Sequence, residues 1–260
     1  MFIDLLERGL SDSGGRLCVG LDPHERLARE PFGRSASGVR RFLMWAIEET
    51  LPHACAYKPN AAFYEAMGSN GLALLQDLTE VLHDAGRSVI LDAKRGDIAS
   101  SAAEYARAAV DVVRADAITV VPYMGTDAVR PFVEKGLFAF LLALPSNPSA
   151  AEIACYGEPP VCVRVAEMAA RLALEYPGRI GLVVGATRPD WVSAMHIVSP
   201  DLLWLVPGVG SQGANLGAFL DAASKHDRMI VTVSRAILGS SDPGQAAAEL
   251  KARLQRREVR

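Results

Sequence analysis

The chain has 260 residues, of which 50% are hydrophobic and 22% are charged, a balance that permits a large buried core. The formal net charge of −3 argues against a nucleic-acid surface, because basic side chains must dominate wherever many phosphates are neutralised. One phosphate-bearing small molecule remains compatible with this charge, since it needs only an arginine and a few oriented backbone amides.

The N-terminal segment carries acidic residues at positions 4, 7 and 12 and lacks the apolar stretch of a secretory signal. The longest apolar runs, such as Leu137–Leu144, are too short to cross a bilayer. The cysteines form no C-x-x-C pair and have no zinc-site spacing with histidine; they are Cys18, Cys55, Cys155 and Cys162. We therefore expect a cytoplasmic protein with no membrane segment and no metal, whose cysteines are reduced core residues.

Eight short apolar runs predict strands, in chain order Leu17–Leu21, Ala54–Lys58, Ser88–Ala93, Ala117–Val121, Phe138–Ala143, Ile180–Gly185, Leu202–Val206 and Met229–Ser234. The runs are continuous rather than alternating, as is typical of parallel strands buried on both faces. Amphipathic patterns between them predict helices at Val39–Leu51, Leu72–Ala85, Ser101–Arg114, Asp127–Lys135, Val161–Tyr176, Pro189–His196, Leu216–Lys225 and Pro243–Arg256.

Repeating β–α units of about 32 residues fit a closed (β/α)8 TIM barrel better than an open doubly wound sheet. No linker or low-complexity tract interrupts them, so we expect one barrel domain over residues 1–260. The segment Pro145–Pro160 is rich in proline and serine and predicts a long loop or a local lid.

In such a barrel the working residues lie at the C-terminal ends of the strands and in the loops that follow. Polar residues recur at these places in this sequence, together with Gly208: Asp22, Lys58, Asp92, Lys94, Ser146, Gln212 and Arg235. Taken singly, Asp22 and Ser146 could be turn residues and Lys58 a solvated charge at the rim. None of the five histidines is assigned to chemistry.

The third predicted strand carries the densest set of charges. Asp92 and Lys94 are two residues apart and should share one face of the strand, and Asp97 should lie on the following loop. The pattern Ser101-Ala-Ala-Glu104 has the form of a capping box, so a helix should start near Ser101. In isolation the motif would indicate a buried ion pair of Asp92 and Lys94, with Asp97 near the start of a helix, rather than a catalytic site. A lysine beside carboxylates stays protonated, which suits a proton donor rather than a Schiff-base nucleophile.

A glycine-rich segment, Pro207–Gly213, follows the seventh predicted strand. Its glycines would let backbone amides approach an anion, and Gln212 could add a side-chain donor. With Arg235 at the end of the eighth strand, the segment predicts a phosphate site in the loops after strands 7 and 8. A glycine-rich segment alone would indicate only a tight turn.

Together these segments resemble the orotidine 5′-phosphate decarboxylase family, and in particular the bacterial type 2 subgroup with an Asp-Ala-Lys-Arg-Gly-Asp signature. The resemblance runs from Val19-Gly-Leu-Asp-Pro23 to Arg235. It includes Tyr57-Lys-Pro, Ser146-Asn-Pro148 and Pro207-Gly-Val-Gly-x-Gln212. The chain departs from the subgroup at Pro145, Ser149 and Ser101, where threonine, glycine and threonine are usual.

The resemblance implies an enzyme that converts orotidine 5′-phosphate to UMP and carbon dioxide in pyrimidine biosynthesis without a metal or organic cofactor. Lys94 would protonate C6 of the pyrimidine, and Asp92 would lie against the substrate carboxylate. Lys58 and Asp22 would contact the ribose hydroxyls and order the charged network.

The resemblance further implies a homodimer in which Asp97, with Ile98 and Ser101, acts in the neighbouring subunit's site. Ser146 would contact the pyrimidine edge. The phosphate would be held by Pro207, Gln212 and Arg235.

Two other functions remain possible from the sequence. A metal-dependent phosphosugar aldolase or decarboxylase of the same superfamily would need a carboxylate at the end of the second strand, where this chain has Lys58. A non-catalytic barrel that binds a phosphorylated ligand would not require Lys94 between two carboxylates.

Overall fold

The computed structural model of the protein describes residues 1–24, 32–33, 35–209 and 216–255. Its strands are β1 (Leu17–Gly20), β2 (Ala56–Lys58), β3 (Ser88–Arg95), β4 (Ala117–Val120), β5 (Phe138–Leu144), β6 (Ile180–Val184), β7 (Leu203–Val206) and β8 (Met229–Val233). Its α-helices are α1 (Phe2–Ser13), α2 (Ala36–Thr50), α3 (Ala61–Glu65), α4 (Ser69–Asp84), α5 (Ala99–Arg107), α6 (Arg130–Glu134), α7 (Ala151–Ala154), α8 (Val161–Glu175), α9 (Val192–Val198), α10 (Leu216–Ala222), α11 (Arg235–Leu238) and α12 (Pro243–Gln255).

The chain contains two compact units, neither of which is continuous in sequence. The first unit comprises Met1–Ala93, Asp111–Asp116 and Val233–Arg260, and the second comprises Lys94–Val110 and Ala117–Thr232. In the first unit β1, β2 and β3 pair in parallel. In the second unit β4 to β8 pair in parallel, each strand with the next.

The strand order is that of a closed barrel, β1 to β8 in sequence, which confirms the predicted (β/α)8 fold. All eight predicted strands are present, and their bounds differ from the prediction by one or two residues. The strands are mostly apolar because both of their faces are covered, as the fully buried β5 illustrates.

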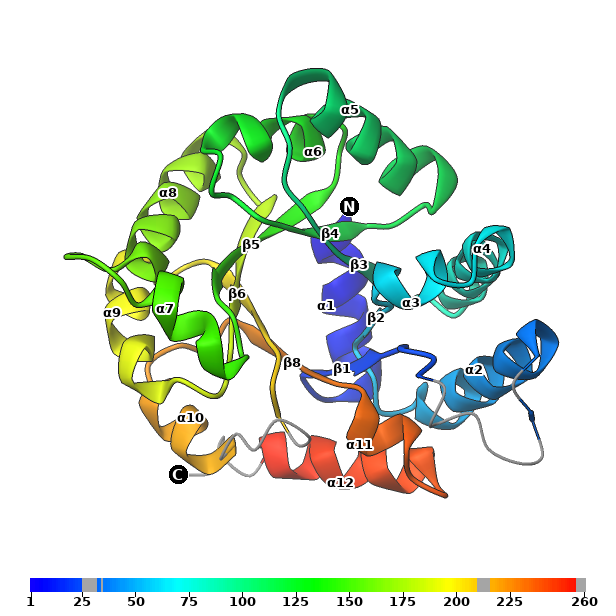
Figure 1. Ribbon diagram of the computed structural model, residues 1–260. Coiled ribbons are helices and arrows are strands. Elements are labelled where there is room, and N and C mark those ends of the chain that lie inside the picture. Colours follow the sequence, from blue (N-terminus) through cyan, green and yellow to red (C-terminus); the bar gives the residue numbers. More distant parts are fainter. Residues whose placement is uncertain (25–31, 34, 210–215, 256–260) are drawn as a thin grey trace. The chain divides into compact units, whose positions relative to one another are not determined.

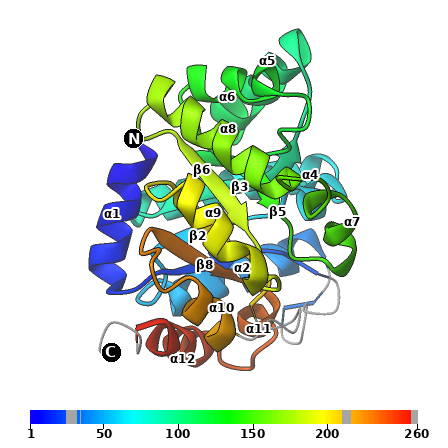
Figure 2. The same ribbon diagram turned by 90° about the vertical axis from the view of Figure 1, so that its left-hand side faces the viewer.

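Helices cover the strands of the second unit on the outside (Figures 1 and 2). Helix α8 packs against β5 and β6, and α9 lies between α8 and α10. The buried residues of α8 recur at helical spacing, Val165, Ala166, Ala169 and Leu172, which is why this stretch forms an amphipathic helix.

In the first unit, α12 packs against α2 and β1 (Figure 1). Helix α1 approaches the segment that leads into β2 so closely that a Cβ on Gly9 would lie 2.1 Å from the carbonyl oxygen of Cys55. Only glycine allows the backbones to meet at this distance, since any side chain would have to displace the β2 segment.

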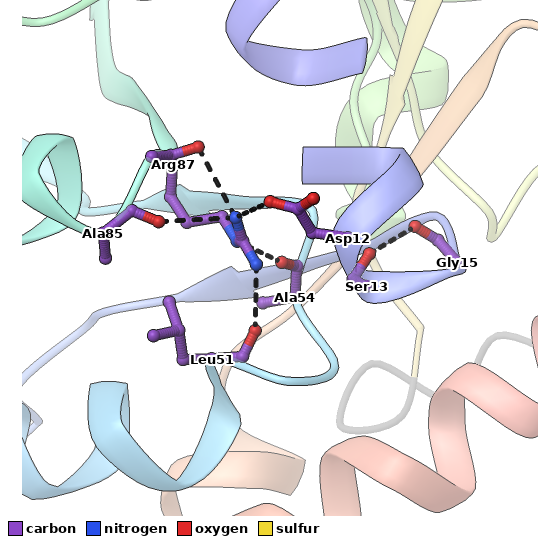
Figure 3. A network of polar contacts seen from close by, with 8 residues as sticks. Asp12, Ser13, Gly15, Leu51, Ala54, Ala85 and Arg87 are labelled. Atoms are coloured by element: carbon purple, nitrogen blue, oxygen red, sulfur yellow. Dashed lines mark hydrogen bonds and ion pairs between the residues drawn. The ribbon is translucent and has the colours of Figure 1, made fainter. Parts of the chain in front are cut away.

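A buried arginine ties α1 to the amino-terminal ends of β2 and β3 (Figure 3). The Arg87 guanidinium donates to the carbonyl of Ala54 at 3.0 Å and to the carboxylate of Asp12, on α1, at 2.9 Å. It also reaches the carbonyls of Leu51 and Ala85 at 3.5 and 3.4 Å. One guanidinium thus donates to main-chain carbonyls before β2 and β3 and to a carboxylate of α1.

Four helices were not predicted: α1, α3, α7 and α11. Helices α3, α7 and α11 have only four or five residues, too few for a helical repeat to show in the sequence. Helix α1 precedes the first strand and so lies outside the β–α alternation. Because α7 falls within Pro145–Pro160, that segment is partly helical rather than wholly irregular.

The predicted capping box at Ser101 is wrong. Helix α5 begins at Ala99 after the N-cap residue Ile98, and no side chain caps it. Ser101 lies in its first turn, and Glu104 accepts hydrogen bonds from Arg107 instead. The helix therefore starts two residues before the serine that the pattern singled out.

Three of the cysteines, Cys18, Cys55 and Cys162, are buried as expected, whereas Cys155 is partly exposed. Burial raises the pKa of the Cys55 thiol well above its usual range. In the part of the chain that the structure describes, no helix has the length and apolar character needed to cross a membrane.

Candidate active site

Three predicted residues meet at the carboxyl ends of β1, β2 and β3 in the first unit. The ammonium nitrogen of Lys58, the last residue of β2, lies 2.7 Å from a carboxylate oxygen of Asp92 on β3. Both residues are buried, with 6% and 8% of their surfaces exposed. Asp22 follows β1, whose end is fixed by a hydrogen bond from the Leu21 N–H to the Lys58 carbonyl.

The charges of this trio support one another. Burial alone would lower the pKa of the Lys58 ammonium, but Asp92 and then Asp22 outweigh that effect, and the pKa is raised. Lys58 therefore remains a cation at neutral pH. One carboxylate oxygen of Asp22 is buried, and it has no hydrogen-bond partner among the described residues.

Two residues that the sequence analysis did not select hold this trio in place. The Tyr64 hydroxyl, on α3, donates to the Leu21 carbonyl at 2.7 Å, next to Asp22. Asn60 pairs with Asp92 as an isolated parallel bridge and caps α3 by accepting from the Ala62 N–H. Asn60 could have been found as an N-cap, because asparagine is favoured there; Tyr64 gave no such signal.

Lys94 lies two residues after Asp92 on β3 and belongs to the second unit. It is exposed, whereas Asp92 is buried. Its φ of +46° is unusual for a residue with a side chain. The extended geometry on which the expectation of a shared strand face rested therefore ends at Lys94.

The residues around Lys94 are held by β4 and the residue after it. The Lys94 N–H donates to the buried hydroxyl of Thr119 at 3.0 Å. The Arg95 carbonyl accepts from the Val121 N–H at 2.7 Å. A Cβ on Gly96 would come within 2.8 Å of the Val121 carbonyl oxygen, so this position of the motif requires glycine.

Asp97 is partly exposed in the loop between β3 and α5, as predicted, and its carboxylate accepts from the Ile98 N–H at 2.8 Å. Ile98 is 51% exposed, and Ser101 is also exposed. Beside this loop the Arg95 guanidinium lies over the Tyr105 ring, 4.9 Å from its centre. Arg95 thus fastens the loop to α5.

Ser146 follows β5 and is partly exposed. Its carbonyl accepts from the Thr187 hydroxyl at 2.9 Å. A Cβ on Gly185, at the end of β6, would lie 2.8 Å from the Ser146 Cα, so glycine there allows the two loops to approach. The main chain at Ser146 is therefore fixed by the neighbouring loop.

The residues assigned to the phosphate are described in part. Pro207 follows β7 in the second unit, and its carbonyl accepts from the Ala186 N–H at 2.9 Å. Gln212 lies outside the described residues. Arg235 is exposed at the start of α11 in the first unit, directly after Ser234, whose hydroxyl is buried.

A family model described as the orotidine 5′-phosphate decarboxylase / HUMPS family matches residues 15–250, which include every candidate site residue. The chain belongs to this family. The family expected from the sequence motifs is therefore confirmed.

Relatives within the orotidine 5′-phosphate decarboxylase family cover almost the whole chain. A protein of that name from Herpetosiphon aurantiacus is 41% identical over 255 residues, 96% of this chain and 93% of its own. One from Roseiflexus castenholzii is 40% identical over 245 residues, 91% of this chain and 88% of its own.

Solved structures of the family agree with the fold. A Toxoplasma gondii protein superposes with a TM-score of 0.91 at 34% identity, covering 98% of this chain and 96% of its own. The structure of Leishmania donovani OMP decarboxylase gives a TM-score of 0.87 at 36% identity and covers 100% of this chain and 99% of its own.

Proposed function

We propose that the protein is an orotidine 5′-phosphate decarboxylase, a carboxy-lyase that forms UMP and carbon dioxide in de novo pyrimidine biosynthesis. The observation that carries the proposal is the buried ion pair of Lys58 and Asp92, with Lys94 two residues further along β3. Membership of the family and relatives of that name along almost the whole chain support the proposal.

The reaction requires a fixed positive charge beside the reacting carbon. Loss of carbon dioxide from C6 leaves a vinylic carbanion that no carbonyl group is placed to delocalise. In the proposal the Lys94 ammonium stabilises the developing charge and then protonates C6. Asp92 lies against the substrate carboxylate, so that departure of carbon dioxide relieves a contact between like charges.

The other site residues bind the parts of the substrate that do not react. Lys58 and Asp22 take the ribose hydroxyls, and the buried, unpaired carboxylate oxygen of Asp22 supports that role. Ser146 contacts the pyrimidine edge. The phosphate is bound by Pro207, Gln212 and Arg235 after strands 7 and 8, which supplies binding energy remote from the reacting carbon.

The proposal includes a homodimer in which Asp97, Ile98 and Ser101 serve the neighbouring subunit's site. Exposed apolar side chains of the second unit support such a contact: Ile98 is 51%, Tyr105 39%, Tyr123 48% and Met124 58% exposed. Large exposed apolar side chains are typical of a surface that another subunit covers. The active protein is further proposed to be one cytoplasmic barrel domain of residues 1–260 that needs no cofactor.

The metal-dependent alternative is disfavoured by Lys58. A Mg²⁺ site requires oxygen ligands. The end of β2 instead carries Lys58, which the neighbouring carboxylates keep protonated. Among the residues described, no three His, Cys, Asp or Glu side chains are grouped so that they could hold a metal. Strained backbone such as that at Lys94 is found at active sites and at ligand clamps, so turnover is what distinguishes the enzyme from a non-catalytic binding barrel.

The experiment follows the loss of orotidine 5′-phosphate absorbance with purified protein in EDTA. We expect turnover under these conditions, with UMP as the product. Absence of turnover, or turnover that requires added Mg²⁺, would contradict the proposal.

A Lys94→Ala variant tests the proton donor, with Lys225→Ala as a matched removal of an exposed lysine outside the site. Lys94→Ala should lower kcat by about 10²- to 10⁴-fold, the usual contribution of a general acid, whereas Lys225→Ala should not change it. Near-normal turnover by Lys94→Ala would refute the role of Lys94 and leave the overall activity standing.

A further inference from the structure

We infer that Thr119 is a positioning residue for catalysis, which acts by holding the backbone of Lys94 through its side-chain hydroxyl. This inference rests on the role proposed for Lys94. Thr119 lies on β4, in the second unit with Lys94, and carries no charge that could itself take part in the reaction.

Lys94 occupies a backbone conformation that needs support. At a φ of +46° the Cβ of an L-residue crowds its own carbonyl group, so residues other than glycine adopt this region at a cost. Such a conformation persists only where the surroundings impose it, and it is concentrated at functional sites. The side chain of Lys94 is exposed, so core packing does not impose it.

Three contacts with β4 and the residue after it fix the backbone from Lys94 to Gly96. The Lys94 N–H donates to the Thr119 hydroxyl at 3.0 Å, and the Arg95 carbonyl accepts from the Val121 N–H at 2.7 Å. Gly96 approaches the Val121 carbonyl so closely that a Cβ would lie 2.8 Å from it. Of the three, only the contact at Lys94 depends on a side chain.

The hydroxyl of Thr119 is a buried polar group in an otherwise apolar strand. The residue is 1% exposed, and it is the one polar residue in the strand Ala117–Val120. A buried hydroxyl is unfavourable unless it is hydrogen-bonded, and the branching at Cβ restricts its rotamers. The oxygen is therefore presented to the Lys94 amide in a nearly fixed direction.

Loss of this contact should act on the chemical step rather than on substrate binding. The ammonium group of Lys94 must meet C6 with good alignment, and small displacements of a catalytic group are costly to rate. The residues proposed for the ribose and the phosphate lie at the ends of β1, β2, β7 and β8, not on β4, the strand of Thr119. The expected signature is a lower kcat with an unchanged affinity for UMP, which lacks the reacting carboxylate.

The experiment compares Thr119→Val, which keeps the shape and removes the oxygen, with Thr119→Ser, which keeps the oxygen. Thr119→Val should lower kcat roughly 10- to 100-fold, the range that corresponds to one lost buried hydrogen bond. Thr119→Ser should recover most of this loss. Calorimetric titration with UMP counts the folded sites and should give a dissociation constant within about twofold of the parent protein.

Thr79→Val is the matched control, because Thr79 is also 1% exposed and its hydroxyl bonds to the Leu75 carbonyl within α4. It should leave kcat unchanged even if the protein is less stable. Unchanged kcat in Thr119→Val, equal losses in Thr119→Val and Thr119→Ser, or a loss confined to UMP affinity would each overturn the inference. Lys94→Ala, measured alongside, separates a failure of this inference from a failure of the role proposed for Lys94.

Discussion

Lys58 and Asp92 form an ion pair where water is largely excluded. The two charges were costly to desolvate, and their attraction at 2.7 Å offsets that cost only while both are present. Such a pair contributes little net stability compared with apolar residues of the same size. Its retention at a strand end is understandable if the charges are needed for chemistry.

Removing one member of this buried pair should lower the free energy of unfolding more than breaking an exposed ion pair does. Asp92→Asn should lower the free energy of unfolding by about 3 kcal/mol, because Lys58 remains buried without its main partner. Asp77→Asn breaks the Arg40–Asp77 pair, of similar length at 2.9 Å but about half exposed, and should cost under about 1 kcal/mol. Denaturant unfolding of the three proteins checks this; equal losses would show that burial is not the cause.

At the scale of elements, side-chain contacts away from the site join helices to the strands. Arg87 joins α1 to the segments that lead into β2 and β3 (Figure 3). In the second unit, the ring of His226 stacks on Trp204 of β7 with centres 3.6 Å apart, and its Nδ1 lies 3.1 Å from Nδ1 of His196 on α9.

Arg87→Met should lower the free energy of unfolding by about 2 to 4 kcal/mol, because the carbonyls of Ala54 and Leu51 lose a charged donor. The melting temperature should fall by roughly 5 to 15 °C for a protein of this size. Asp12→Asn is the control: Asp12 is half exposed, and its loss should cost under about 1 kcal/mol. A melting temperature of Arg87→Met within 2 °C or so of the parent would contradict this account.

Stability should depend on pH through His226. Burial lowers the pKa of His226 to about 4, below that of an unfolded histidine near 6.5. The unfolded chain therefore binds the proton more readily. The stability from this group is complete above about pH 6.5 and is lost as the pH falls toward 4, by roughly 3 kcal/mol in all.

The hydrogen bonds of the ring fit a neutral His226 in the folded protein. Nε2 of His226 lies 3.1 Å from the Arg228 carbonyl and must donate to it, which leaves Nδ1 to accept from His196. A second proton would abolish that acceptor. Denaturant unfolding at several pH values should show a weaker acid dependence for His226→Phe than for the parent; parallel curves would exclude His226 as the source.

At the scale of the whole molecule, the proposed dimer makes the site a shared one. In a mixture of Asp97→Ala and Lys94→Ala proteins, a heterodimer contains one site with both wild-type residues. Because half of randomly paired dimers are heterodimers, about one quarter of parental activity should return. Each variant alone should remain inactive.

The complementation is measured after the two proteins are unfolded together and refolded, with heterodimers verified by distinct tags. A mixture of Asp97→Ala with Asp97→Ala carrying the second tag is the control and should stay inactive. Verified heterodimers without activity would refute the action of Asp97 across the interface while leaving decarboxylation itself intact.

The sequence by itself determined the eight strands, most of the longer helices and the places of the charged residues. Runs of buried aliphatic residues and helical repeats are local patterns, and polar residues at the ends of such runs are visible without knowledge of the fold. The motif from Asp92 to Asp97 also led to the family, which the comparisons confirmed. The roles of the site residues remain predictions.

Only the tertiary structure showed that Asp92 pairs with Lys58, 34 residues away in sequence, and that Thr119 bonds to the Lys94 backbone. The start of α5 and the short helices were likewise beyond the sequence patterns. These features depend on which strands are neighbours and on backbone angles such as the φ of Lys94, and neither is encoded in a local repeat. The sequence determined which residues carry charge, and the packing of β2, β3 and β4 decided which of them are partners.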